Sequence, residues 1–279
     1  MRATIFSLLS GLLLQAMPAA EIQPGKPFDY PSKAFYPKRW IEKKLTAPML
    51  PWIGEEIALV TPDKEYDSAA ISNFVGHLDS GWRLYGELIG ERPRMLKNFE
   101  GAPTIVALPH NGLSCGYGCG YVGASGIEMS NFDKHLAGSV KDPLNIPHAY
   151  FYEMGRNYFV FGHRHSCFTT GFAVFIRYVC TDTLKLNDGD KLTRQTIDEA
   201  IARFEKNEMS FIDAMTNHGP HGEKGNRLKD EDGREISPSD QPVIYASLML
   251  QLRKEFGAND FFERFYKQLL ACPAIEPVD

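Results

Sequence analysis

One short stretch of the chain carries side chains at a spacing that could do chemistry. In Tyr152-Glu153-Met154-Gly155-Arg156 the first and last residues lie four positions apart, so on a helix they share a face, with Glu153 beside them. Zinc peptidases use this geometry in HExxH, where two histidines hold the metal and the glutamate activates a water. Here the histidines are replaced by a phenol and by a guanidinium, which has no lone pair to give. The stretch predicts the frame of such a site without its zinc ligands.

The same stretch also fits an ordinary amphipathic helix, in which Glu153 forms a surface pair with Arg156 or Asn157. If the helix instead lines a cleft, Arg156 is a fixed cation near the position of the missing metal. His148 precedes Tyr152 by four residues and lies on nearly the same face. We therefore take Tyr152, Arg156, Asn157 and His148 as candidate binding residues and Glu153 as the candidate catalytic residue.

A second group of candidate ligands is His163-x-His165-x-Cys167. Imidazole and thiolate bind zinc or copper well, and alternate positions of an extended segment point to the same side. Three ligands are not a complete site, and Cys167 could instead form a disulfide with Cys180. A zinc site at this place, completed by a distant carboxylate, is the alternative to a plain surface loop.

Other hydrolase signatures are incomplete. Gly123-Ala124-Ser125-Gly126 is not the GxSxG elbow of a serine hydrolase, and no papain-type cysteine motif is present. Glu128 is a further candidate binding residue and could form a carboxylate pair with Glu153, as in glycoside hydrolases, but nothing in the sequence sets their separation. Whether the chain is an enzyme stays open at this point.

The residues Glu153-x-Gly155-x-Asn157 resemble the glutamate, glycine and asparagine of HExGHN in enhancin-like, mucin-directed zinc metallopeptidases (gluzincins). The ending Leu248 to Gly257, followed by Phe261-Phe262-x-x-Phe265, is similar to the late leucine-rich helix, Phe-Gly and aromatic helix of that family. The resemblance covers roughly Tyr66 to Leu270. It places Phe172 where such enzymes carry the glutamate that is their third zinc ligand.

This resemblance implies an α+β, zincin-like fold: a twisted sheet with an edge strand, an active-site-type helix and a helical C-terminal subdomain. Because Tyr152, Arg156 and Phe172 stand where the metal ligands would be, it also implies a non-catalytic metallopeptidase homologue, a pseudoenzyme without a cofactor. Its cleft would bind glycoprotein, peptide or carbohydrate. The first alternative is an active secreted, peptidase-like hydrolase with a non-standard centre that uses zinc. The second is a secreted structural or interaction protein without a cleft.

Periodicity and turn residues predict the elements that would position these side chains. Residues 21–65 form a proline-rich lead-in with a short strand at 56–60, and 66–279 form a single domain. In its sheet-containing half, 66–161, we expect a helix over 71–89 stopped by Gly90, strands at 104–108 and 127–129 after a glycine-rich segment, and a helix over 148–161. In its mainly helical half, 162–279, we expect an apolar stretch at 170–180, helices around 197–204, 243–256 and 261–269, and a polar excursion at 216–241.

The start of the chain predicts export. Arg2 precedes a short apolar stretch, Ile5 to Leu14, and small residues follow, which is the order of a secretory signal peptide over 1–20; a buried helix is the alternative. The protein would then be secreted or periplasmic, where its five cysteines could form two disulfides and leave one thiol. Cys115-x-x-x-Cys119 favours a local bridge or plain burial over a redox or zinc role.

Composition excludes several classes of protein. A net charge of −5 with no basic block argues against nucleic-acid binding, which needs a concentrated cationic face. Aromatic residues make up 12% of the chain, which is too much apolar material for a disordered protein. The one sustained apolar run is too short to span a membrane. A globular, mildly acidic chain remains.

Overall fold

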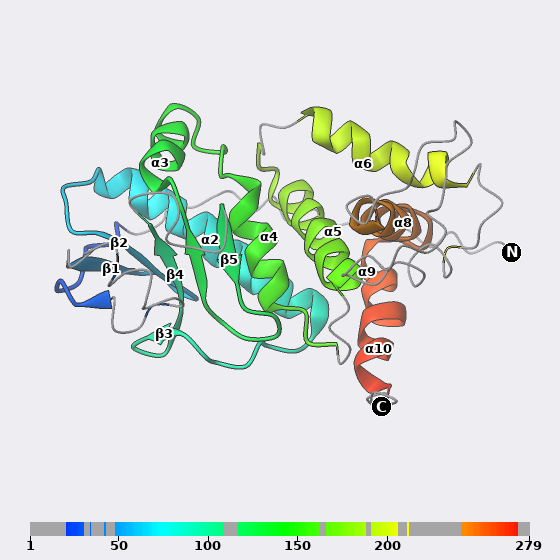
Figure 1. The fold of residues 1–279 in the computed structure, drawn as a ribbon, viewed down its shortest axis with the longest axis horizontal. Helices are drawn as coiled ribbons and strands as arrows, with labels where there is room; N and C mark the ends of the chain where they lie inside the picture. Colours follow the sequence, from blue (N-terminus) through cyan, green and yellow to red (C-terminus); the bar gives the residue numbers. More distant parts are fainter. Residues whose placement is uncertain are drawn as a thin grey trace, which may run out of the picture.

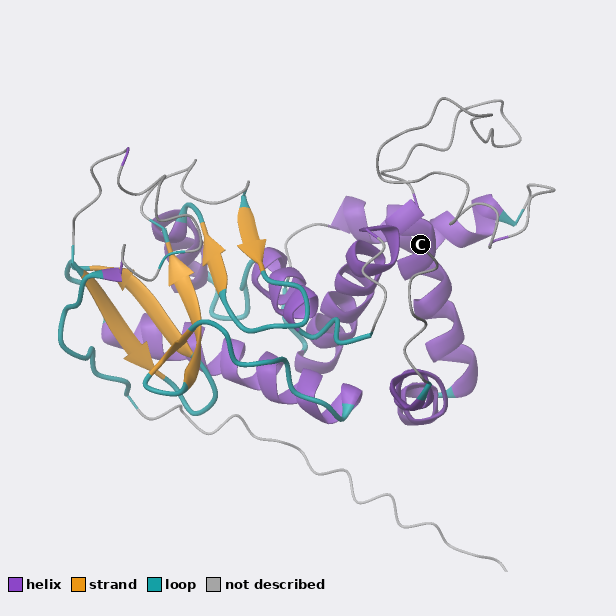
Figure 2. Ribbon diagram, turned by 60° about the horizontal axis from the view of Figure 1, so that its bottom comes forward, coloured by secondary structure: helices purple, strands orange, loops and turns teal. Residues whose placement is uncertain are grey.

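The computed structural model describes residues 21–30, 34, 42, 48–108, 117–161, 166–187, 191–205, 211 and 241–272. Over these residues the architecture is α+β: a mixed sheet with helices on one side continues into a helical half (Figure 1). Figure 2 shows the strands gathered at one end and the C-terminal helices at the other. The α+β class expected from the sequence is confirmed.

The sheet has six strands in the order β1-β2-β4-β6-β5, with β3 paired to β4. The pairs β2–β4 and β4–β6 are parallel, whereas β1–β2, β3–β4 and β5–β6 are antiparallel. A short antiparallel strand, β5, therefore ends the sheet on the side of α4. The strands are β1 (Met49–Ile53), β2 (Ala58–Pro62), β3 (Asn98–Phe99), β4 (Ala102–Ala107), β5 (Gly118–Gly120) and β6 (Ile127–Met129).

Alternation along the strands gives the sheet two different faces. Ile105 and Ile127 belong to the large core that includes the buried side chains of the helices. Val106, between Ile105 and Ala107, belongs to a smaller cluster on the other face, together with Val60 and Tyr30. A side chain at position 128 must therefore point away from the helices.

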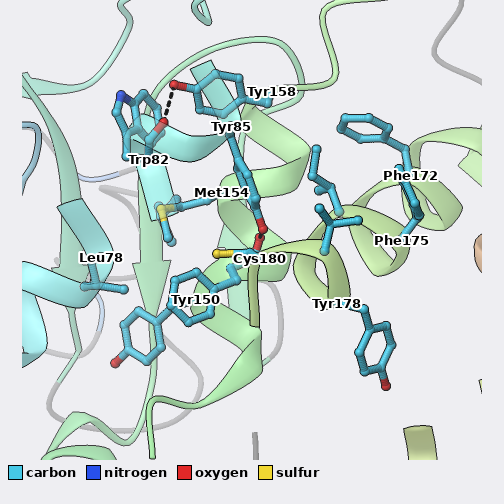
Figure 3. Packing of buried hydrophobic residues seen from close by; sticks show 14 of the residues in the cluster. Leu78, Trp82, Tyr85, Tyr150, Met154, Tyr158, Phe172, Phe175, Tyr178 and Cys180 are labelled. Carbon is cyan, nitrogen blue, oxygen red and sulfur yellow. Dashed lines mark hydrogen bonds between the residues drawn. The ribbon is translucent and has the colours of Figure 1, made fainter. Parts of the chain in front are cut away.

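The first long helix, α2 (Ser68–Ile89), follows the predicted periodicity closely. Asp67 caps its start by accepting a hydrogen bond from the Ala70 N–H, and Gly90 ends it at φ 79°, a left-handed conformation that suits glycine. The expected helix over 71–89 is confirmed. Its apolar side packs beside α4 and α5, where the Tyr158 hydroxyl donates to the Trp82 carbonyl at 2.8 Å (Figure 3).

Two shorter helices follow the sheet strands in the chain, between β6 and α5. α3 (Phe132–Lys141) was not predicted, and α4 (His148–Asn157) begins after Pro147 as expected. α4 ends at Asn157 instead of Phe161, because Tyr158 leaves the helix and the chain turns through Phe159 and Val160. α4 thus has one end near the turn that joins β5 to β6.

The helical half consists of α5 and the helices around it. α5 packs against α4 and α8, and an aromatic cluster of Phe175, Phe261, Phe262 and Tyr266 fills the space toward the C-terminal helices. The helices are α5 (Ser166–Leu184), α6 (Lys191–Phe204), α8 (Gln241–Phe256), α9 (Ala258–Phe261), the π-helix η2 (Phe262–Tyr266) and α10 (Lys267–Ala271). The helices expected over 197–204, 243–256 and 261–269 are confirmed. In the described part of the chain no helix is long and apolar enough to cross a membrane.

The segment expected as a separate lead-in belongs to the sheet. β1 and β2 both lie before residue 66, and Phe28 exchanges two main-chain hydrogen bonds of 2.9 Å with Met49 of β1. The strand expected at 56–60 is β2, shifted by two residues. The expectation was wrong because prolines were taken as evidence against strands. Pro51 lies in a strand near the sheet edge and Pro62 at a strand end, and at both places the missing N–H is tolerated. The signal-peptide prediction for 1–20 and residues 216–240 of the polar excursion lie outside the described residues.

Candidate functional site

Glu153 lies on α4 directly against the edge strand β5. A Cβ built on Gly120 would lie 2.8 Å from the main-chain oxygen of Glu153, and a Cβ built on Gly118 would lie 2.5 Å from Met129 Sδ and 3.2 Å from Glu153 Cγ. Contacts this close leave room for glycine alone, so the two glycines of β5 allow the strand to approach the helix. Glu153 is only 6% exposed as a result.

The burial of Glu153 changes its chemistry. Desolvation raises the pKa of the Glu153 carboxyl to about 7, although Arg156 and the Gly120 N–H both favour the charged form. Arg156 Nε lies 3.7 Å from Glu153 Oε2, and both atoms are buried without a hydrogen-bond partner among the described residues. The expectation of a surface pair is therefore wrong in one respect: the two groups do pair, but their facing atoms are buried.

Asn157, the last residue of α4, is fully buried. Its side-chain amide donates to the carbonyls of Tyr121 at 2.8 Å and of Gly126 at 3.4 Å, which joins the end of α4 to the β5–β6 turn. Asn157 thus holds the end of α4 in place, and its part in ligand binding stays a prediction. Tyr152, in contrast, is partly exposed on α4 one turn before Arg156.

His148, at the start of α4, turns toward α5. Its Nδ1 accepts a hydrogen bond from Arg177 Nη1 at 2.5 Å, and Arg177 Nη2 donates to the Tyr178 hydroxyl at 2.8 Å. Because a guanidinium can only donate, Nδ1 of His148 is unprotonated in this contact. His148 therefore helps to fix α4 against α5, and nothing described brings it to Glu153.

Glu128 lies on β6 and is fully buried on the sheet face opposite α4. The Tyr30 hydroxyl is hydrogen-bonded to it, and burial together with the Glu128 charge raises the pKa of Tyr30. Glu153 packs on the helical side of the same sheet. The structure therefore does not bring the two carboxylates together as a catalytic pair.

Phe172, the position matched to the third zinc ligand, lies in the aromatic core. Its ring contacts those of Phe159, Phe161 and Tyr266 at centroid distances of 5.3 to 5.6 Å. Among the described residues, no group of three His, Cys, Asp or Glu side chains could hold a metal ion. The alternative ligands His163 and His165 lie outside the described residues, as does the side chain of Cys167.

The cysteines are partly described. Cys119 of β5 is disulfide-bonded to a cysteine whose side chain lies outside the described set. Cys180 is a buried free thiol, and Cys272 is an exposed one. A bridge between Cys167 and Cys180 is therefore wrong.

A hydrogen-bonded chain that sequence reasoning missed lies beside Glu153. His135 of α3 joins the Tyr117 hydroxyl through Nε2 and the Tyr150 hydroxyl through Nδ1, the latter at 3.1 Å. Burial lowers the pKa of His135 to about 4, so the imidazole is neutral near pH 7. Tyr117 precedes β5 and is 50% exposed, while Tyr150 is buried one turn before Glu153 on α4. The sequence signal was weak, because His135 occupies a buried position of a helix with few apolar residues.

Comparisons with known proteins do not assign the chain to a family: it matches no protein-family model, no curated protein and no solved structure.

Proposed function

We propose that this chain is an exported, zincin-like, non-catalytic metallopeptidase homologue that binds a glycoprotein, peptide or glycan where α4 meets β5. Three features support the proposal: an antiparallel edge strand, a helix packed against it, and a glutamate between them at the second position of the degenerate motif Tyr152 to Arg156. The ligand positions of that motif hold Tyr152 and Arg156, whose side chains suit hydrogen bonding and charge pairing better than zinc ligation.

The observation that carries the proposal is the unsatisfied pair of atoms at this site. Glu153 Oε2 can accept a hydrogen bond and Arg156 Nε can donate one, yet neither has a partner in the described part of the chain. An unmade hydrogen bond of this kind costs about 1–3 kcal/mol per group. The Arg156 side chain is 31% exposed, so a ligand can reach its guanidinium from solvent. A ligand group that offers both a donor and an acceptor, such as a peptide amide or a sugar hydroxyl, would satisfy both buried atoms once it displaces the side chains that cover them.

One observation favours the second candidate, an active hydrolase with a non-standard centre. A carboxyl with a pKa of about 7 is well matched to general base catalysis near neutral pH. In such a hydrolase Glu153 would accept a proton from a water, and His163, His165 and a distant carboxylate would hold a zinc ion. Structural ion pairs also shift pKa values, which is why the binding function is preferred.

The test is a binding assay on three preparations of one probe: an intact mucin, its deglycosylated protein and its released glycans. Surface plasmon resonance with the wild type would identify which part is bound. Arg156→Gln removes the charge and should weaken binding about 10-fold or more, since hydrogen bonds to charged groups contribute about 1.5–3 kcal/mol. Arg264→Gln is the matched control, because that side chain is 76% exposed and its pair with Asp260 is loose, at 3.8 Å.

Metal content and hydrolysis separate the two candidates. The protein should be purified without chelator or metal-affinity resin, and its zinc measured by mass spectrometry. Hydrolysis of the mucin by the wild type, lost in Glu153→Gln and accompanied by about one zinc per chain, would overturn the binding proposal in favour of the hydrolase. Equal mucin binding by the wild type and Arg156→Gln would overturn the placement of the ligand at α4.

A further inference from the structure

The sheet face opposite α4 contains a cavity of about 250 Å³. Its walls come from three separate segments: Phe28, which is tied to β1 by its two hydrogen bonds with Met49; Asn98 and Phe99 of β3; and Thr104 of β4. Each of these segments is held by main-chain pairing. The cavity is therefore preformed, which is usual for small-molecule sites.

The cavity combines a ring surface with polar groups. The rings of Phe28 and Phe99 lie 4.7 Å apart between centroids at an angle of 44°, and both side chains are partly exposed. Thr104 is 3% exposed, and its Oγ1 is buried with no hydrogen-bond partner in the described structure. Asn98 uses its Oδ1 to accept from the Gly101 N–H at 3.3 Å, and its NH₂ group makes no hydrogen bond to a described residue.

The chemistry of these walls indicates the class of ligand. An aromatic face packs against C–H groups, while a hydroxyl and an amide NH₂ offer hydrogen bonds to a polar edge. A pyranose ring has both kinds of surface: C–H groups on one face and hydroxyls around its rim. Among the described residues that line the cavity there is no carboxylate, and Lys97 is the one cation, so a strongly charged ligand is a poorer match. At about 250 Å³ the cavity is slightly smaller than the ~300–1,000 Å³ of usual ligand pockets, so a single ring is the expected size of ligand.

We propose that this cavity binds one neutral sugar ring, with Phe28 and Phe99 against its C–H face and Thr104 and Asn98 on its hydroxyls. The site is separate from the surface at Glu153 and Arg156, because it lies on the other side of the sheet. It does not depend on the function proposed above. A glycoprotein bound at α4 and a sugar bound here would be distinguishable by mutation.

The experiment is saturation-transfer NMR and calorimetric titration of the wild-type chain with glucose, galactose, mannose, N-acetylglucosamine and N-acetylgalactosamine. At least one sugar should receive saturation, and its affinity should fall about 10-fold or more in Thr104→Val and in Asn98→Asp. Thr104→Val removes a hydroxyl that has no described partner and keeps the shape of the side chain. Asn98→Asp keeps the oxygen that accepts from Gly101 and removes the NH₂ donors, so both variants should stay folded.

Phe99→Ala tests the ring surface, and Phe256→Ala is its control because Phe256 is 58% exposed at the end of α8. Sugar binding should be lost in the first variant and unchanged in the second. Arg156→Gln should leave sugar binding intact, whatever it does to mucin binding. Failure of all five sugars to bind, or equal affinity in the wild type, Thr104→Val and Asn98→Asp, would overturn the proposal.

Discussion

Gly155 of α4 lies directly against Ile176 of α5. A Cβ built on Gly155 would approach Ile176 Cγ2 to 2.7 Å and the Cα of Ala173, which is main chain, to 3.1 Å. Main chain cannot yield as a flexible side chain can, so the two helices would have to separate. The glycine in the Glu-x-Gly-x-Asn pattern of α4 thus serves helix packing in this chain, and so does Asn157, which holds the end of the same helix.

Gly155→Ala should lower the free energy of unfolding by about 1–3 kcal/mol, the usual range for overpacking a core. Urea unfolding followed by circular dichroism would measure it. Gly138→Ala on α3 is a matched control, since the nearest atom to its built Cβ is 3.6 Å away and alanine is the better helix former. Gly138→Ala should be neutral or up to about 1 kcal/mol more stable. Similar losses in both variants would contradict the packing role of Gly155.

Asp79 is a buried carboxylate on the apolar side of α2. It accepts main-chain hydrogen bonds of 2.9 Å from Glu55, Glu56 and Ile57, and so fixes the turn between β1 and β2 against the helix. Asp79→Ala would leave three N–H groups without this acceptor and should cost about 3 kcal/mol of stability. Asp79→Asn keeps one acceptor oxygen and should cost less. Asp198→Ala, which breaks an exposed pair with Arg194, should cost under about 1 kcal/mol in the same unfolding assay.

Asp79 also shows where sequence reasoning stops. The helix over 71–89 could be predicted because its apolar residues recur every three and four positions and Gly90 ends it. A carboxylate among those positions reads as a break in the pattern. The Asp79 carboxylate accepts its hydrogen bonds from a turn more than twenty residues earlier in the chain, and local periodicity cannot predict a partner at that distance.

The strand β5 and the helix α3 were not predicted, because neither has a clear local pattern of apolar residues. β5 has the sequence Gly-Cys-Gly, which carries no alternation, and it exists because β6 and α4 hold it on two sides. α3 buries His135 and Ser139 beside its few apolar residues, so its pattern of apolar positions is faint. The Glu153–Arg156 pair could be predicted from helical spacing. Its burial could not, because it is set by the close approach of β5.

The two described free cysteines should differ sharply in reactivity. Burial raises the pKa of the Cys180 thiol, whereas Cys272 lies exposed after α10. Since the thiolate is the reactive form, iodoacetamide should label Cys272 in the native protein and reach Cys180 only on unfolding. Peptide mapping by mass spectrometry before and after urea would show this. Rapid native labelling of Cys180 would contradict its buried position on α5, where its Sγ lies against Gly81 of α2.

Glu153 should make the protein less stable as the pH rises from mildly acidic to neutral. Its pKa is about 7 in the folded chain, against a usual value of 4.5, so between these pH values the folded state binds more protons than the unfolded state. Stability is then fully present below about pH 4.5 and falls as the pH passes through 7, by up to about 3 kcal/mol. His135, whose pKa is lowered to about 4, acts in the opposite sense between about pH 6.5 and 4.

Glu153→Gln isolates the contribution of this one carboxyl. The variant keeps the shape of the side chain and cannot ionise, while His135 titrates in both proteins and cancels in the comparison. The difference in unfolding free energy between Glu153→Gln and the wild type should therefore grow in favour of the variant from pH 4.5 to 8, as followed by urea titration at half-unit steps. Parallel curves would mean that the carboxyl ionises at an ordinary pH. In that case Glu153 would be solvated or satisfied in the folded protein, and the buried, unpaired oxygen that supports ligand binding at α4 would be lost as an argument.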